Sequence, residues 1–325
     1  MVSVAKIMTI MTILPALITF IVGYMLIKYP VSISMPTDRG MHKNAIATSG
    51  GIALIIGFSI IFLPHAYGIL LILIGFLGFL DDKYSLKKYL RFGIQILISV
   101  YLILDTHESF LHLHGFLFLF ILIFISTYTI NIYNFMDGID QLAIIQAVFF
   151  VLSSMLLGFI FISIDLALVL IAFFLINYPR TRIFLGNSGS YMLGLYVAII
   201  ITKYMLFLGP ISTIPLFILM TTFYIDTTYT IIVRFVAKFK DKNSSIISSI
   251  SHITEAHRTH LYQKLAIKLN SHPKTVLLIM LYNIIWCLPL SYLAVNYSDL
   301  SLILLFLSYA PYTYYCYINK AGIES

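Results

Sequence analysis

Long apolar runs separated by short polar segments dominate this chain. A helix needs about 20 apolar residues to cross the hydrocarbon core of a bilayer, and runs of roughly that length predict about eleven spanning helices. Some of these runs are short. They cover residues 4–28, 48–64, 66–80, 91–105, 113–133, 141–162, 164–179, 189–208, 211–233, 275–296 and 299–318. The pattern therefore predicts an all-α, polytopic integral membrane protein.

Composition supports this class and excludes a soluble globular protein. Of 325 residues, 60% are hydrophobic and only 10% are charged, whereas soluble domains carry about 25% charged residues. The first run is too long for a signal-peptide core and lacks a small-residue cleavage site, so we interpret it as a spanning helix. We expect one transmembrane domain over residues 1–325, with a long cytoplasmic loop at 235–274. Cys287 and Cys316 lie inside predicted spans and indicate neither a disulfide framework nor a metal site.

The basic residues predict the orientation. With the N-terminus outside, 18 of the 20 Lys and Arg residues fall in cytoplasmic segments, the exceptions being Lys6 and Lys203. The C-terminus is then cytoplasmic as well. The opposite loops contain no Lys or Arg and carry Asp105, Glu108, Asp165 and Asp299. The net charge of +7 is therefore a property of the cytoplasmic face, where it can contact anionic lipids or an anionic substrate.

Paired carboxylates end the third run. Asp81 and Asp82 lie at the edge of hydrocarbon, where charge is costly, which makes them functional candidates. Adjacent carboxylates repel each other, so holding both ionised calls for a cation such as Mg²⁺ or a neighbouring Lys. One of them could instead act as general base toward a phosphate acceptor. The structural alternative is a solvated helix end.

A second polar segment follows the fifth run. Asn131, Asn134 and Asp137 are spaced i, i+3, i+6, which places them along one side of a helical end. Their oxygens suit a hard cation such as Mg²⁺. Asp140 follows three residues later. A purely apolar span has no need for this density of polar residues.

Three further cytoplasmic segments have the chemistry of phosphate binding. Residues 36–51 contain Lys43 and a glycine pair, and residues 186–194 are small residues at a helix start, where backbone N–H groups favour anions. Both segments can also be an ordinary basic loop and a glycine-rich turn. His257, Arg258 and His260 form a clamp for phosphate or sugar.

The segment around this clamp adds two expectations. Residues 257–268 predict an amphipathic helix within the long loop. Asp226, near the end of the ninth run, is a lone buried carboxylate. We expect Asp226 to orient a cation or to pair with Arg234.

Taken together, these motifs resemble the polyprenyl-phosphate N-acetylhexosamine-1-phosphate transferase superfamily. The resemblance covers almost the whole chain, and the motifs at 36–51, 78–82, 131–140, 186–194, 226–227 and 257–263 occur in the family order. Eleven spans and the sequence His-Arg-x-His-Leu-Tyr-Gln resemble the bacterial O-antigen-initiating, undecaprenyl-phosphate branch more than the peptidoglycan branch. The resemblance implies a multi-pass protein of the bacterial cytoplasmic membrane.

The reaction that the resemblance implies transfers a sugar 1-phosphate from a UDP-N-acetylhexosamine-type sugar to undecaprenyl phosphate and releases UMP. It begins a cell-surface glycan such as O-antigen or capsule, and it requires Mg²⁺, with Mn²⁺ as the alternative. The partners are the two substrates and membrane lipids, without nucleic acid. The sugar and the oligomeric state, including a homodimer, are left open.

The resemblance also assigns roles to residues. Asp81 and Asp82 would deprotonate the acceptor or position the metal, and Asp137 and Asp140 would organise the nucleotide site as further catalytic acids. Metal contacts would come from Asn134 and Asn187. The substrate-binding residues would be Lys43, Asn131, Asp226, His257, Arg258 and His260.

Two positions depart from the family pattern. Asn187 stands where the Gly-Asp-x-Gly-Ser motif has its acidic residue, and Gln141 stands where glycine is usual. The first change leaves a second hypothesis open, in which the protein is a catalytically weak relative that binds the lipid carrier or a partner enzyme. A third hypothesis, an ion-coupled transporter, explains acids in a membrane but not their restriction to one face.

Overall fold

The computed structural model describes residues 2–34, 46–63, 65–106, 115–178, 180–240 and 257–324. Within these ranges the chain is helical, apart from a two-stranded antiparallel pair of β1 (Ile33–Ser34) and β2 (Ile46–Ala47). The predicted all-α class is confirmed. The chain divides into two compact units, one ending at Pro210 and the other beginning at Ile211, and each is described by itself.

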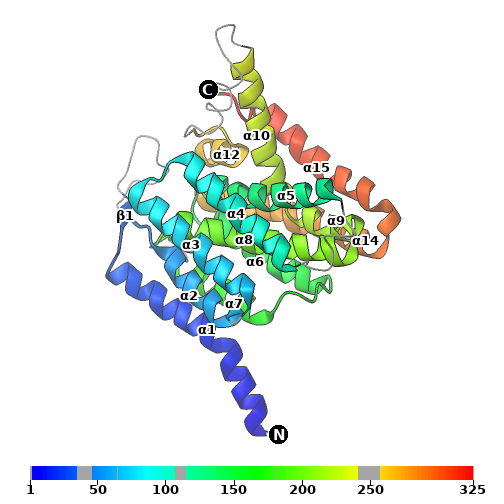
Figure 1. The fold of residues 1–325 in the computed structure, drawn as a ribbon. Coiled ribbons are helices and arrows are strands. Elements are labelled where there is room, and N and C mark those ends of the chain that lie inside the picture. Colours follow the sequence, from blue (N-terminus) through cyan, green and yellow to red (C-terminus); the bar gives the residue numbers. More distant parts are fainter. Residues whose placement is uncertain are drawn as a thin grey trace. The chain divides into compact units, whose positions relative to one another are not determined.

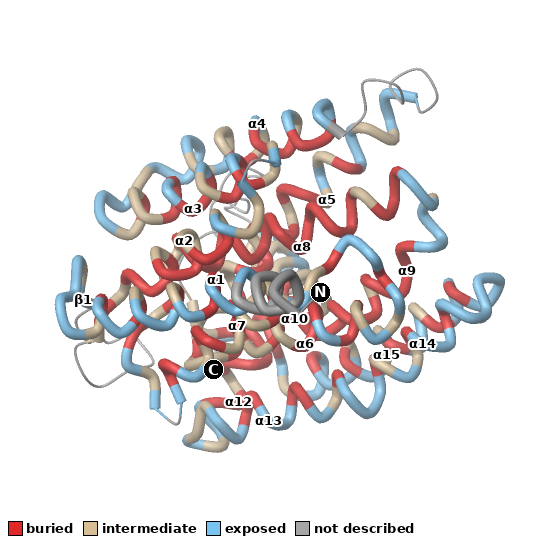
Figure 2. The backbone as a smooth tube through the Cα atoms, turned by 90° about the horizontal axis from the view of Figure 1, so that it is seen from below, coloured by how far each residue is buried: buried red, intermediate tan, exposed pale blue. Residues whose placement is uncertain are grey.

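The first unit is built around one central helix. Its helices are α1 (Val2–Lys28), α2 (Gly50–Phe62), α3 (Ala66–Tyr84), α4 (Lys88–Thr106), α5 (Phe116–Phe135), α6 (Leu142–Leu156), α7 (Ile164–Ile176) and α8 (Gly186–Leu208). Helix α8 packs against α2, α3 and α5 (Figure 1). It is buried along most of its length, as its red colour in Figure 2 shows. The residues at its first turn are therefore held by three surrounding helices.

Glycines allow α8 to approach its neighbours closely. A Cβ atom on Gly78 of α3 would collide with the backbone of Asn187, and one on Gly194 of α8 would collide with the backbone of Ile130. Small residues let helices in apolar surroundings pack backbone to backbone. These contacts bring the ends of α3 and α5 to the start of α8.

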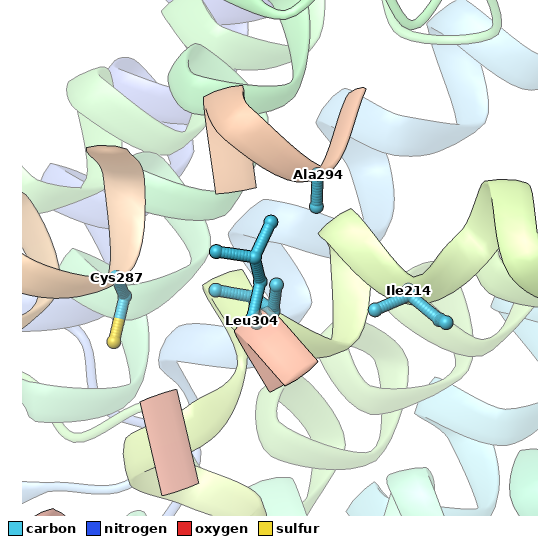
Figure 3. Packing of buried hydrophobic residues seen from close by; sticks show 5 residues of the cluster. Ile214, Cys287, Ala294 and Leu304 are labelled. Carbon is cyan, nitrogen blue, oxygen red and sulfur yellow. The ribbon is translucent and has the colours of Figure 1, made fainter. Parts of the chain in front are cut away.

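The second unit contains α9 (Pro210–Leu219), α10 (Thr221–Phe239), α12 (Leu261–Leu269), α13 (His272–Tyr282), α14 (Leu288–Asn296) and α15 (Ser301–Ile318). A π-helical turn, η1 (Asn283–Cys287), joins α13 to α14, and a 3₁₀ turn, η2 (Ser298–Leu300), precedes α15. One apolar cluster gathers side chains from α9, η1, α14 and α15 (Figure 3): Ile214, Ile218, Cys287, Ala294 and Leu304. A second cluster joins α12 to α15 through Leu261, Leu265, Tyr312, Cys316 and Ala321.

Several helices have the length and composition of membrane spans. In the described part of the chain, four segments qualify: Met11–Lys28, Phe116–Phe135, Gly186–Leu208 and His272–Asn296. Helices α9 and α10 together would make a fifth span, and α2, α6 and α7 are shorter apolar helices. A multi-pass membrane protein is thus supported, while the count of eleven spans and the orientation of the termini stay predictions.

One predicted span has a different shape. The run at 211–233 is predicted as one span, and in the structure it divides into α9 and α10, which meet at a bend of 85°. Pro215 removes one backbone donor from α9, and the Thr221 hydroxyl donates to the Ile218 carbonyl at 2.7 Å. Both features weaken the regular i→i−4 ladder near the break.

Candidate functional site

Asp81, at the end of α3, accepts four hydrogen bonds. Its Oδ2 accepts from Arg91 Nη1 at 2.6 Å, from the Tyr191 hydroxyl at 3.0 Å and from Asn187 Nδ2 at 2.9 Å. Its Oδ1 accepts from the Leu86 backbone N–H at 3.0 Å. The Asp81 side chain is buried, and Arg91 supplies the cation that paired carboxylates require. Asp81 therefore fastens the end of α3 to α4 and α8.

Asp82 caps the start of α8 from a different helix. Its Oδ1 accepts from the Asn187 backbone N–H at 3.0 Å and its Oδ2 from the Ser188 N–H at 3.4 Å. Helix N-termini carry unpaired donors and a positive dipole end, so a carboxylate is favoured there. Gly186 begins the helix at a φ of 70°, and a Cβ atom at Gly186 would lie 2.7 Å from Asp82 Oδ2.

The pKa of Asp82 is raised toward neutral pH. Burial raises the pKa of Asp82 to about 6, the two backbone N–H bonds oppose that rise, and the negative charge of Asp81 adds to it. A carboxyl with a pKa in this range can take up or release a proton at the pH of the cytoplasm. Asp82 thus has the properties of a general base, whereas Asp81 is occupied by four donors.

Asn187 links Asp81 to Asn134 through both ends of its amide. Its Nδ2 donates to Asp81, and its Oδ1 accepts from Asn134 Nδ2 at 2.6 Å. Asn134 also donates to the Ser190 hydroxyl at 3.1 Å. Because the Asp81 carboxylate only accepts, the amide orientation follows from the network. A carboxylate at position 187 could not donate to Asp81.

Asp137 follows α5 and lies within electrostatic reach of Asp82. Burial raises the pKa of Asp137 well above its usual value, and the charges of Asp82 and Asp140 act in the same direction. Among the described residues no donor is hydrogen-bonded to the Asp137 carboxylate. The charge of Asp82 thus opposes ionisation of Asp137, and a bound metal ion would favour the ionised form of both carboxyls.

The donors fit one mode of magnesium binding. Among the described residues, no group of three or more His, Cys, Asp or Glu residues is arranged to hold a metal. A closed protein cage is therefore absent from this part of the chain. Magnesium is commonly held by one or two carboxylates, with water and substrate phosphates completing the octahedron. Asp82, Asp137 and the amide oxygen of Asn134 are donors of that kind.

The contacts of Gln141 explain why this position accepts a residue other than glycine. It has a φ of 66°, in the left-handed region where glycine costs least. Its Nε2 donates to the Asn177 carbonyl at 2.6 Å. Asn177 in turn accepts the backbone N–H groups of Arg182 and Ile183 at 2.9 and 3.0 Å. The side chain at position 141 thus ties the turn after α5 to the segment before α8.

In the second unit, Asp226 caps α12. Its Oδ1 accepts from the Leu261 N–H at 2.9 Å and its Oδ2 from the Tyr262 N–H at 2.9 Å. His260 Nδ1 lies 3.2 Å from Asp226 Oδ1. Asp226 thus binds His260 and not Arg234, whose Nη1 lies 3.5 Å from Glu324 Oε1. Asp226 is fully buried and is a positioning residue.

The histidine clamp, formed by His257, Arg258 and His260, is held by helix capping and ring stacking. His260 is the N-cap of α12, and its backbone N–H donates to Gln263 Oε1 at 3.3 Å in a capping box. The rings of His257 and His260 stack with centroids 5.0 Å apart, and Tyr262 stacks on His260 at 5.6 Å. The predicted amphipathic helix is present, and it begins at Leu261.

The remaining candidates are placed as follows. Asn131 Nδ2 donates to Gln95 Oε1 at 2.7 Å and to the Thr127 carbonyl at 2.8 Å, so its amide links α5 to α4. Lys43 lies outside the described residues. The structure thus groups Asp81, Asp82, Asn134, Asp137, Asp140 and Asn187 in the first unit, and Asp226, His257, Arg258 and His260 in the second.

Sequence reasoning missed two partners of Asp81. Arg91 was interpreted only as a topological charge, although a cation ten residues after paired acids was an available signal. Tyr191 gave no signal, because it lies 110 residues from Asp81 in the chain and looks like any other aromatic residue of an apolar helix.

Comparisons with known proteins match the part of the chain that contains the first-unit candidates. The family model described as Glycosyl transferase family 4 matches residues 64–205, which include α3, α5 and the start of α8. An undecaprenyl-phosphate alpha-N-acetylglucosaminyl 1-phosphate transferase of Thermotoga maritima is 27% identical over 50% of this chain and 54% of its own length. A phospho-N-acetylmuramoyl-pentapeptide-transferase of Fervidobacterium nodosum is 33% identical over 50% of this chain and 60% of its own.

A longer match supports the same relationship. A probable undecaprenyl-phosphate N-acetylglucosaminyl 1-phosphate transferase of Bacillus subtilis is 26% identical over 94% of this chain and 88% of its own length. With the first relatives the chain shares a little over half of their length. The two kinds of relative differ in the sugar that their names specify.

Proposed function

Because the chain belongs to the polyprenyl-phosphate N-acetylhexosamine-1-phosphate transferase superfamily, we propose that it transfers an N-acetylhexosamine 1-phosphate from a UDP-sugar to undecaprenyl phosphate. The reaction takes place at the cytoplasmic face of the bacterial cytoplasmic membrane and releases UMP. The product begins a cell-surface glycan, for which O-antigen and capsule are the candidates. A lipid acceptor calls for a membrane-embedded enzyme, and a soluble UDP-sugar calls for a cytoplasmic opening.

The observation that carries the proposal is that Asp82 and Asn134 both contact Asn187 at the first turn of α8, while Asp137 lies within electrostatic reach of Asp82. Backbone N–H groups at a helix start favour phosphate, while carboxylates repel it. A divalent cation held by the acids would resolve this conflict. Phosphoryl transfer depends mainly on positioning and charge neutralisation. Carboxylates that can hold a cation, next to a helix start, are groups of the kind it needs.

We assign Mg²⁺ as the metal, with Mn²⁺ as the alternative, and Asp82, Asp137 and Asn134 as the residues that would hold it. When bound, the ion neutralises charge on the phosphates and stabilises the UMP leaving group. An oxygen of the acceptor phosphate attacks the β-phosphorus of the UDP-sugar, and the bond from that phosphorus to the bridging oxygen breaks. Any proton on the attacking oxygen would go to the oxygen of Asp82 that does not contact the ion.

Other residues support these steps. Asp81 keeps the ends of α3 and α8 together through Arg91, Tyr191 and Asn187. In the second unit, His257, Arg258 and His260 bind phosphate or sugar oxygens, and Asp226 holds His260 through Nδ1. Fixing one ring nitrogen sets the tautomer and ring orientation that the other nitrogen presents.

The direct experiment measures UMP released by purified protein supplied with undecaprenyl phosphate, Mg²⁺ and a panel of UDP-N-acetylhexosamines. We expect release with at least one UDP-sugar, only when the lipid acceptor is present, and loss of release after chelation by EDTA. No release with any member of the panel, from protein that still binds the substrates, would contradict the transferase assignment.

That outcome would favour the second candidate function, a relative that binds the lipid carrier or a partner enzyme with little turnover. The observation behind it is Asn187, whose amide donates to Asp81 where an acidic side chain would add a charged metal ligand. A neutral ligand lowers the attraction for a hard cation. Binding of undecaprenyl phosphate without UMP release is the result that this function predicts.

A further inference from the structure

An apolar cavity of about 400 Å³ lies within the second unit. Helices α12, α13 and α15 surround it, and its wall includes Leu265, Leu278, Ile279, Tyr282, Tyr312 and Ile318. Leu278 and Ile318 are half exposed, at 46% and 50%. The cavity therefore opens through an apolar surface of the kind that faces lipid in a membrane protein.

Two lysines outside the wall of this cavity are close neighbours, along the chain, of residues that line it. Lys264 precedes Leu265 on α12, and Lys320 follows α15 two residues after Ile318. Lys264 Nζ donates to the Lys320 carbonyl at 2.7 Å, so the ends of α12 and α15 lie together here. In the described part of the chain no carboxylate is paired with either lysine. Burial and then the charge of Lys320 lower the pKa of Lys264, as expected for two ammonium groups that share one neighbourhood.

We propose that this cavity binds one anionic phospholipid of the bilayer, with an acyl chain between α12, α13 and α15 and the headgroup phosphate at Lys264 and Lys320. The apolar cavity suits an acyl chain, and the two nearby lysines suit the negative headgroup at its end. Basic residues next to spanning helices on the cytoplasmic side attract anionic headgroups. The cavity lies at the small end of the range for ligand pockets, about 300–1,000 Å³, which favours a single acyl chain over a long polyprenyl chain.

Occupancy would have a consequence for the histidine clamp. Leu265 lines the cavity, and its helix α12 begins at His260, which Asp226 holds from α10. A chain packed against α12 adds buried apolar area to a helix of only nine residues. The bound phospholipid thus stabilises the element that presents the clamp. This inference rests on the second unit alone and does not depend on the transferase assignment.

Native mass spectrometry of the full-length protein in detergent tests the proposal. The protein is titrated with phosphatidylglycerol and, separately, with phosphatidylcholine that carries the same acyl chains. One lysine near an anionic headgroup is worth about fivefold in affinity, so two lysines give about 30-fold. We expect that preference for the first phosphatidylglycerol bound, and we expect the variant Lys264→Gln/Lys320→Gln to lose it while binding phosphatidylcholine as before.

Two further variants separate the headgroup from the chain. Leu278→Trp fills the cavity from its exposed side and should reduce binding of both lipids at this site. Lys87→Gln removes an exposed lysine in the first unit and should leave the preference unchanged. Equal affinity for the two lipids, a preference that survives the double lysine change, or unchanged binding in Leu278→Trp overturns the proposal. Displacement of phosphatidylglycerol by lower concentrations of undecaprenyl phosphate also overturns it, since the acceptor would then be the occupant.

Discussion

At the scale of single residues, the side chain at position 187 decides how the first site is held together. Asn187 donates to Asp81 and accepts from Asn134, so its amide joins these two side chains directly. The sequence shows that this position departs from the family pattern, but the compensating contacts join residues 106 and 53 positions apart. The sequence identifies Asn187 as unusual, but only the fold shows which side chains it contacts.

We predict that Asn187→Asp makes stability depend on Mg²⁺. The change replaces a donor to Asp81 with a like charge, which costs about 1–3 kcal/mol in a metal-free site where the lost bond is part-buried. Thermal unfolding should shift down in EDTA and recover with Mg²⁺, and the Mg²⁺ concentration for half-maximal activity should fall because a hard cation prefers carboxylate oxygen. Asn131→Asp, on α5 but bonded to Gln95, is the matched control and should show no recovery. The same Mg²⁺ midpoint in Asn187→Asp and wild type would show that position 187 does not contact the metal.

We also predict that Asp81 and Asp82 separate into different roles. Asp82→Asn should lower turnover at least about 100-fold, the scale of losing a general base, with a small effect on folding. Asp81→Asn should lower thermal stability as well. It leaves Arg91 without its carboxylate partner, and it puts an amide where four donors need a carboxylate acceptor. Turnover and unfolding midpoints of both variants are the measurements. Full activity in Asp82→Asn would remove Asp82 from the chemistry.

At the scale of elements, each unit has a helix whose N-terminus is capped by a carboxylate from another helix. Asp82 of α3 caps α8, and Asp226 of α10 caps α12, so each unit anchors a functional helix start with a carboxylate from another helix. The apolar runs predicted α3, α4 and α5 closely, because a buried or lipid-facing helix needs continuous hydrophobicity. They did not predict the bend at Met220, because the run stays apolar through it and a direction change leaves no mark in hydrophobicity.

We predict that Asp226→Ala disorders the start of α12. It leaves the buried N–H groups of Leu261 and Tyr262 without their acceptor, at a cost of about 1–3 kcal/mol for each unsatisfied group. Thermal unfolding should shift down, and the KM for the UDP-sugar should rise more than kcat falls if the histidine clamp binds substrate. Asp299→Ala, at an exposed residue of η2, controls for loss of an acid and should change neither quantity. A normal KM in a folded Asp226→Ala protein would remove the clamp from substrate binding.

At the scale of the whole molecule, all functional acids and the basic clamp are expected on one face of the membrane. The all-α class and the multi-pass character follow from the apolar runs alone, and the charge asymmetry of the loops predicts the orientation. Contacts between distant segments do not follow from such patterns. The ion pair of Asp81 with Arg91 lies within ten residues, yet it depends on how α3 and α4 pack.

The orientation predicts labelling from opposite sides. A cysteine at Lys88, at the start of α4, should react with a membrane-impermeant thiol reagent only from the cytoplasmic side, and one at Asp165, at the start of α7, only from outside. Cys287 and Cys316 are buried and should contribute little background. Reaction of both positions from the same side would contradict the topology, and with it a single functional face.

The central claim is that Asp82 and Asp137 form a cation-dependent transfer site at the start of α8, and a Mg²⁺ titration of UMP release tests it most directly. Wild-type protein should be inactive in EDTA and saturate with Mg²⁺. Asp137→Asn removes a carboxylate from the site, and even the loss of an outer-shell partner weakens metal binding by about tenfold or more. We therefore predict at least that shift in the Mg²⁺ midpoint for Asp137→Asn. UMP release that is insensitive to EDTA, or an Asp137→Asn protein with the wild-type midpoint, would contradict the account.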